Sequence, residues 1–158
     1  MIYDFSKRLV DIVGSSLALI ILSPFLFLIA IAIKMDSQGP VMADTPMRVG
    51  KGGRLFKMYK FRSMVQNAQE ILDNNPKLLA EYKKNSYKIF KDPRVTKVGK
   101  FIRRFSIDEF PQFLNILKGE MSLVGPRAYY PYELDEQQEK YPTSRKFVKI
   151  ILAVLASP

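Results

Sequence analysis

The chain has 158 residues, with 25 Lys and Arg against 15 Asp and Glu, and therefore a formal net charge of +10. This length supports one hydrophobic core of ordinary size and is too short for two. Cysteine and histidine are absent, which excludes disulfides, thiol nucleophiles, histidine acid–base catalysis and zinc sites built from His and Cys. Catalysis would rest on carboxylates, Lys, Arg, Tyr, Ser or the backbone, and any metal would be a hard cation such as Mg²⁺.

The first predicted element is an apolar N-terminal helix. Residues 12–33 carry no charge, and as a helix they would reach roughly 33 Å, enough to cross a bilayer core of roughly 30 Å. A signal peptide, a straight transmembrane helix and a re-entrant helix all fit this segment. The signal-peptide interpretation is the weakest, because the apolar run is longer than the usual h-region.

The re-entrant interpretation starts from Ser23 and Pro24, near the middle of the run. Proline removes a backbone donor and clashes with the preceding turn, and a serine hydroxyl can satisfy the carbonyl that is released. Cations flank both ends of the run at Lys7, Arg8 and Lys34, which suits two cytoplasmic ends. A kinked spanning helix fits the same residues, so this pattern favours re-entrance only slightly.

The remaining chain predicts a small mixed domain. An extended edge stretch over residues 41–49, a turn at 50–53 and a strand over 55–64 together predict a β-hairpin. Helices are expected over residues 66–72, from 76 to about 90, near 108–118 with a stop at Gly119, and from about 144.

Positive charge is gathered in two stretches, and such surfaces attract phosphates of nucleic acids, lipid headgroups or nucleotides. Beside a membrane helix, lipid headgroups are the simplest explanation, ahead of a nucleotide diphosphate and nucleic acid. On a regular strand Lys57 and Lys60 point to opposite faces, so the two would not line one site without a bulge. The two clusters are Arg48, Lys51, Arg54, Lys57, Lys60 and Arg62, and Lys91, Arg94, Lys97, Lys100, Arg103 and Arg104.

Asp108 and Glu109 are the most chemically suggestive pair. At a helix start both carboxylates can reach one cation and gain from the helix dipole. The ordinary explanation is a capping box formed by Ser106 and Glu109. Against it, Pro111 makes the helix start ambiguous, and Arg103 upstream brings a cation towards the carboxylates, as a phosphoryl-transfer site needs.

The loop over residues 122–127 is the second candidate. Gly125 permits close backbone approach and Pro126 restricts the turn, while the guanidinium fork of Arg127 grips a phosphate at two points. A generic turn with a surface arginine would show the same pattern.

The order of these motifs resembles the bacterial sugar transferases, which are monotopic phosphoglycosyl transferases that begin polysaccharide and glycoconjugate assembly. The resemblance covers nearly the whole chain, and the run SIDEFPQFLNILKGEMSLVGPR at residues 106–127 carries it most specifically. The other matching stretches are KRLVD at 7–11, LSP at 22–24, KMYKFRSM at 57–64 and DPRVT at 92–96.

The resemblance implies transfer of a sugar-1-phosphate from a UDP-sugar to polyprenyl (undecaprenyl) phosphate, with release of UMP. Asp108 would attack the sugar-side phosphate and form a covalent aspartyl-phosphosugar, which the lipid phosphate then accepts. Glu109 would take the acceptor's proton or position Mg²⁺, the cofactor that the family places on the nucleophilic aspartate, here Asp108. The family's phosphate-binding positions match Arg127 with its loop residues Gly125 and Pro126, and the basic positions Arg103 and Lys60.

The implied fold class is α/β (α+β), with a re-entrant helix broken at Ser23-Pro24 over residues 1–35. A mostly helical catalytic domain with a short β-hairpin and interfacial amphipathic helices would follow over 36–158. The implied location is the cytoplasmic face of the bacterial inner membrane. The implied partners are a UDP-sugar, polyprenyl phosphate and membrane lipid, without nucleic acid, and a homo-oligomer is compatible with the family.

Two departures from the family pattern stand out. Ala128 occupies a position where the family often has a second proline. The chain also stops at Ser157-Pro158, whereas the family continues through a Pro-Gly-Ile-Thr-Gly-like segment, so we expect a truncated chain with weakened or absent turnover. The competing hypothesis is a non-enzymatic membrane module that binds anionic lipid or nucleic acid, which would depend on Arg54 and Lys57 but not on Asp108.

Overall fold

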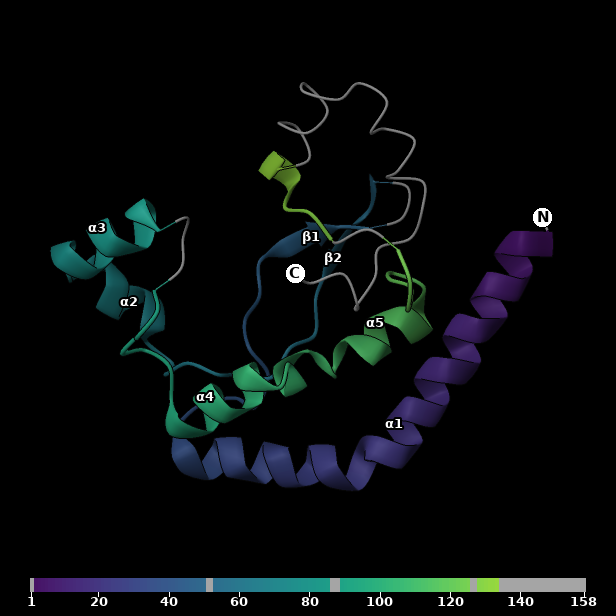
Figure 1. The fold of residues 1–158 in the computed structure, drawn as a ribbon, viewed down its shortest axis with the longest axis horizontal. Coiled ribbons are helices and arrows are strands. Elements are labelled where there is room, and N and C mark those ends of the chain that lie inside the picture. Colours follow the sequence, from purple (N-terminus) through teal and green to yellow (C-terminus); the bar gives the residue numbers. More distant parts are fainter. Residues whose placement is uncertain (1, 51–52, 86–88, 126–127, 134–158) are drawn as a thin grey trace.

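The computed structural model describes residues 2–50, 53–85, 89–125 and 128–133 (Figure 1). This part of the chain is mostly helical with one two-stranded sheet, which confirms the coarse fold prediction. Its elements are α1 (Ile2–Asp36), β1 (Met47–Val49), β2 (Leu55–Lys57), α2 (Ala68–Asp73), α3 (Pro76–Lys84), α4 (Lys97–Arg104), the 3-10 helix η2 (Ile107–Glu109) and α5 (Gln112–Lys118).

Helix α1 continues through Ser23 and Pro24 without interruption, so the predicted break at these residues is not confirmed. The continuous helix does change direction along its length (Figure 1). Pro24 has no N–H to donate to the carbonyl of Ile20, and Ser23 Oγ donates to that oxygen instead at 2.9 Å. Among the described residues, α1 is the one helix long and apolar enough to cross a membrane.

The first half of α1 is fastened to the end of α5 by polar contacts. Arg8 donates from Nη1 to the Ile116 carbonyl at 2.6 Å and from Nη2 to the Leu117 carbonyl at 2.7 Å. Both carbonyls lie in the last turn of α5, where the Ile116 carbonyl also accepts from the Gly119 N–H, so Arg8 caps the C-terminal end of α5. Nearby, the buried Asp11 accepts hydrogen bonds from the loop that follows α5.

The second half of α1 packs against α4 and η2. Ile29 and Ile33 share a buried apolar cluster with Phe61, Ile102 and Ile107. At its end, Asp36 Oδ2 accepts from the backbone N–H of Val98, in the first turn of α4, at 3.0 Å, where an anion is favourable. Both halves of α1 therefore lie against the same small domain (Figure 1).

The predicted hairpin is confirmed, but its strands are shorter than expected. β1 and β2 pair antiparallel with Arg48 opposite Phe56, and pairing returns at a single bridge between Met42 and Phe61. Between them Pro46 offers no N–H, and the Thr45 hydroxyl bonds to the Met58 carbonyl at 2.7 Å. The ladder is interrupted because a proline and a side-chain bond stand where backbone bonds would continue it.

The helix predictions are mixed. The predicted stop at Gly119 is confirmed, since α5 ends at Lys118 and Gly119 follows it in a left-handed conformation with φ 80°, whereas α3 stops at Lys84, well before residue 90. The helix expected near 108–118 is divided into η2 and α5. α4 was not predicted as a helix, although Thr96 Oγ1 caps it by accepting from Gly99 N at 2.9 Å. The helix expected from about residue 144 lies outside the described residues.

Candidate active site

Lys60 brings the two predicted carboxylates together. Its Nζ lies 2.9 Å from Asp108 Oδ2 and 3.0 Å from Glu109 Oε1. Asp108 is 3% exposed, and a buried carboxylate requires a charged or hydrogen-bonding partner. Glu109 and Lys60 are each about a third exposed, so the ion pair reaches from the protein interior to its surface.

The backbone around Asp108 is held from both sides. The Phe61 N–H donates to the Asp108 carbonyl at 2.8 Å, and Ile107 lies in the buried apolar cluster. Ser106, just before η2, has φ 54° and makes no side-chain cap. The capping-box explanation for Ser106 and Glu109 is therefore wrong, because the left-handed backbone at Ser106 turns the chain sharply from α4 into η2 instead.

Arg103 also lies beside the site, at the end of α4. Its Nε donates to Ser63 Oγ at 2.7 Å. Although the residue as a whole is exposed, partial burial of its guanidinium lowers the pKa of Arg103, and the negative charge of Asp108 opposes that shift. Arg103 stays a cation at neutral pH, because the ordinary pKa of an arginine lies far above neutrality.

The segment from Lys60 to Ser63 organises these contacts. Lys60 binds the two carboxylates, Arg62 donates to the carbonyls of Ser37 and Gln38 at the exit of α1, and Ser63 holds Arg103. Lys57, by contrast, pairs with the exposed Asp44. Lys57 and Lys60 therefore bind different carboxylates, but β2 ends at Lys57, so the alternation of strand faces, on which the prediction rested, does not extend to Lys60.

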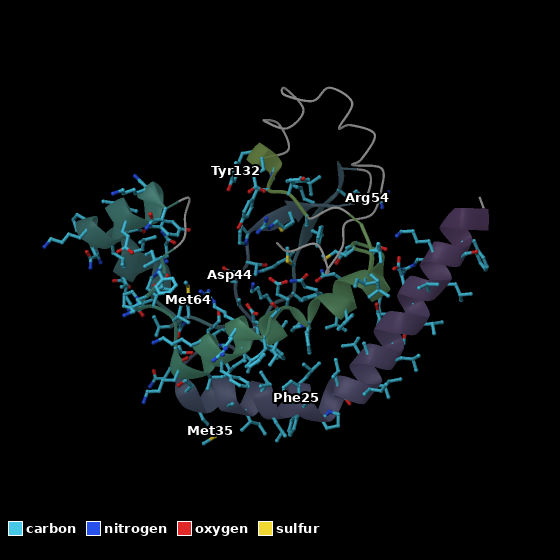
Figure 2. The ribbon with its side chains drawn as sticks, viewed as in Figure 1. Phe25, Met35, Asp44, Arg54, Met64 and Tyr132 are labelled. Atoms are coloured by element: carbon cyan, nitrogen blue, oxygen red, sulfur yellow. The ribbon has the colours of Figure 1, made fainter. Side chains whose placement is uncertain are left out.

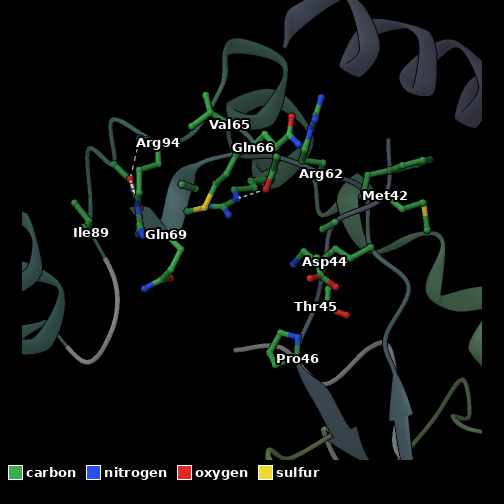
Figure 3. Close-up of a pocket in the computed structure, with 18 of the residues that line it drawn as sticks. Met42, Asp44, Thr45, Pro46, Arg62, Val65, Gln66, Gln69, Ile89 and Arg94 are labelled. Atoms are coloured by element: carbon green, nitrogen blue, oxygen red, sulfur yellow. Dashed lines mark hydrogen bonds and ion pairs between the residues drawn. The ribbon is translucent and has the colours of Figure 1, made fainter. Parts of the chain in front are cut away.

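A cavity of about 1180 Å³ opens next to the ion pair. Figure 3 shows one wall with Met42 and Asp44 facing another with Gln69, Ile89 and Arg94. Its cationic lining residues are Lys60, Arg62, Arg94 and Arg103, and its acidic ones are Asp44 and Asp92. Asp108 and Glu109 are not among the lining residues, so Lys60 stands between the cavity and the two carboxylates.

Across the cavity, Arg94 and Asp92 form a buried bidentate pair. Arg94 Nε lies 2.9 Å from Asp92 Oδ1, and Nη2 lies 2.7 Å from Oδ2. Burial alone would raise the pKa of Asp92, but the hydrogen bonds and the charge of Arg94 outweigh it and lower the pKa from the ordinary 3.8. Asp92 and Arg94 therefore give the cavity a polar wall that is held by an ion pair.

The donor set for Mg²⁺ is sparse. Within the described ranges, no group of three or more acidic residues gathers as a metal cage. Mg²⁺ is commonly held by one or two carboxylates, with waters and substrate phosphates completing its octahedron. Asp108 and Glu109 fit a metal of that kind, provided that a phosphate-bearing substrate supplies further oxygens.

The loop after α5 is only partly described. Gly125 is half-buried, whereas Pro126 and Arg127 lie outside the described residues. The described part is fastened to α1, because Lys7 Nζ donates to the Val124 carbonyl at 2.7 Å and Asp11 binds Ser122 and Leu123. Sequence reasoning missed this role of Asp11, whose signal was a lone acid at the edge of the uncharged run.

Apolar side chains cover the outside of α1. Figure 2 shows Met35 pointing away from the domain. Helix α4 adds an exposed pair, Phe101 and Phe105, whose rings lie 5.1 Å apart. The exposed large apolar residues of α1 are Phe5, Leu9, Val10, Ile12, Val13, Leu17, Ile20, Ile21, Phe25, Phe27, Leu28, Ile31 and Met35.

Comparison with known proteins matches residues 2–155 to a family described as bacterial sugar transferase. The chain is 48% identical over 135 residues to the undecaprenyl-phosphate galactose phosphotransferase of Salmonella typhimurium, covering 83% of this chain and 28% of that protein. It is 43% identical over 141 residues to the undecaprenyl-phosphate glucose phosphotransferase of Komagataeibacter xylinus, covering 85% and 24%. It is 43% identical over 147 residues to the exopolysaccharide production protein ExoY of Sinorhizobium fredii, covering 89% and 64%. The chain thus spans under a third of the length of the first two relatives.

Proposed function

The chain belongs to the bacterial sugar transferase family, and from this premise we propose that it is a membrane-bound phosphoglycosyl transferase. The proposed reaction moves a sugar-1-phosphate from a UDP-sugar to polyprenyl phosphate. The observation that supports this reaction is the position of the buried Asp108. Asp108 and Glu109 both form ion pairs with Lys60, beside a cavity with four cationic lining residues. Two carboxylates next to a cationic cavity suit a carboxylate nucleophile and a diphosphate.

In the proposed first step, an Asp108 carboxylate oxygen attacks the sugar-side phosphorus. The new O–P bond forms as the bond to the nucleoside monophosphate breaks, and that group leaves with the electron pair. In the second step, an oxygen of the lipid phosphate attacks the aspartyl-phosphosugar and returns Asp108 as a carboxylate. Mg²⁺, when bound, would offset the charge of the phosphates.

The chain's own residues supply the rest of the proposed site. Lys60 and Arg103 line the cavity nearest Asp108 and would neutralise the diphosphate oxygens. Glu109 would orient Lys60 and accept a proton from the incoming lipid phosphate. Arg127 remains a proposed phosphate ligand on the family resemblance alone.

The re-entrant topology is part of the proposal. A straight transmembrane helix separates its two ends by the whole bilayer, whereas Arg8, near one end of α1, and Asp36, at the other, both contact the same domain. The bend in α1 (Figure 1) and its exposed apolar side chains suit an element that enters and leaves through one leaflet. This would hold the site at headgroup level on the cytoplasmic face, with Phe101 and Phe105 at the interface.

Intact-mass spectrometry of the protein in nanodiscs tests the function. After incubation with Mg²⁺ and a panel of UDP-sugars, we expect the wild-type chain to gain the mass of one sugar phosphate. Asp108→Asn should gain none, whereas Glu81→Gln, which changes an exposed carboxylate of α3 outside the cavity lining, should behave as the wild type. An adduct on Asp108→Asn would reject Asp108 as the nucleophile, and no adduct with any donor would favour the non-enzymatic membrane module.

A further inference from the structure

Lys60 occupies the position between the two carboxylates and the cavity. Its Nζ is 2.9 Å from Asp108 Oδ2 and 3.0 Å from Glu109 Oε1, while the same side chain lines the cavity. Asp108 and Glu109 do not line that cavity themselves. A donor phosphate that enters the cavity therefore meets the lysine before it meets the proposed nucleophile.

The ammonium also occupies the space between the two carboxylates. Nζ contacts Asp108 Oδ2 and Glu109 Oε1, so a divalent cation shared by these two side chains would lie beside the ammonium. An ammonium and a divalent cation within a few ångströms of each other repel strongly where burial weakens solvent screening. Because Asp108 is 3% exposed, both cations cannot occupy this position together.

We propose that Lys60 is a built-in counter-ion that competes with the divalent cation for Asp108 and Glu109. It releases these two carboxylates only when a diphosphate binds in the cavity. This inference rests on the proposed function. In the donor-free state Lys60 stabilises the buried Asp108 and keeps metal affinity low. A bound diphosphate offers the ammonium new anionic partners in the cavity and supplies oxygens to the metal, so donor and metal bind together.

The test measures metal binding without any donor. Mn²⁺, a paramagnetic substitute for Mg²⁺, is titrated into nanodisc-held protein, and the free ion is read by electron paramagnetic resonance. Lys60→Met should bind Mn²⁺ at least tenfold more tightly than the wild type, and Lys60→Arg should bind it as weakly as the wild type. Lys57→Met is the matched control, because Lys57 also pairs with an aspartate but contacts neither carboxylate of the site, and its affinity should be unchanged.

Two further variants keep the result interpretable. Lys60→Gln retains a hydrogen-bond donor for Asp108, so it serves if Lys60→Met does not fold, and it should show the same gain. Lys60→Met with Asp108→Asn should lose the gain, because the metal then lacks its buried ligand. If the folded neutral variants bind Mn²⁺ no more tightly than the wild type, the inference is overturned. The sugar-phosphate adduct on the wild type decides the proposed function separately, since this titration needs no catalysis.

Discussion

Asp11 Oδ1 lies 2.8 Å from Ser122 Oγ, although 111 positions separate these residues in the chain. The same oxygen accepts from the Leu123 N–H at 2.9 Å. Asp11 is 2% exposed, and its second oxygen has no partner among the described residues. Helix α1 and the loop that leads to Gly125 are thereby joined by one buried carboxylate.

This contact predicts that Asp11 stabilises the fold. Asp11→Ala would leave the Ser122 hydroxyl and the Leu123 N–H without their acceptor, at a cost of about 2 kcal/mol. In a protein of this size that is a fall in Tm of roughly 4–8 °C, measured by thermal unfolding in nanodiscs. Asp44→Ala, at an exposed position, should change the Tm by less than about 2 °C. Equal falls in Tm for Asp11→Ala and Asp44→Ala would contradict the prediction that the buried hydrogen bonds of Asp11 stabilise the fold.

A second prediction concerns the contribution of Asn115 to stability. It is fully buried in α5, where Oδ1 accepts from Tyr59 N at 2.9 Å and Nδ2 donates to the Lys57 carbonyl at 2.9 Å and to Glu120 Oε2 at 2.7 Å. Asn115→Leu would remove these bonds and leave backbone groups unpaired, for a loss of about 3 kcal/mol. Asn74→Leu, at an exposed position after α2, is the control for thermal unfolding. A small change in Tm for Asn115→Leu would show that water replaces the hydrogen bonds that the Asn115 amide makes.

Local signals predicted part of this structure and long-range contacts account for the remainder. The turn glycines indicated the hairpin and Gly119 indicated the end of α5, because each depends on a few neighbouring residues. The family resemblance placed Lys60 among the basic positions of the site, but its ion pair with Asp108 was not predicted, because it joins positions far apart in the chain and has no local pattern. Asn115 and Asp11 were missed for the same reason, since their partners become neighbours only after folding.

Two substitutions at Ser106 test whether this residue holds a strained backbone conformation or caps a helix. Its φ of 54° is left-handed and its side chain caps nothing, so Ser106→Ala should change the Tm by less than about 2 °C. Ser106→Gly removes the steric cost of a Cβ in this conformation and should stabilise the protein by about 0.5–1 kcal/mol. Thermal unfolding of both variants checks this. A clearly lower Tm for Ser106→Ala, together with no rise in Tm for Ser106→Gly, would support the capping-box explanation after all.

The Asp92–Arg94 pair predicts a dependence of stability on pH. Arg94 lowers the pKa of Asp92 below its ordinary 3.8, so the folded protein holds a proton at this group less readily than the unfolded chain. The stabilisation is therefore complete above about pH 4 and is lost as the pH falls through the lowered pKa.

The measurement compares the Tm of the wild type and Asp92→Asn from pH 7 down to pH 3. At pH 7 the variant should be less stable by about 3 kcal/mol, because both partners are buried and the substitution leaves the Arg94 charge unpaired. The gap should narrow below about pH 4, because the unfolded wild-type chain then takes up a proton at Asp92, whereas the folded protein does so only at the lowered pKa. A gap that stays constant across this range would mean that Asp92 stabilises the cavity wall through packing and not through its charge.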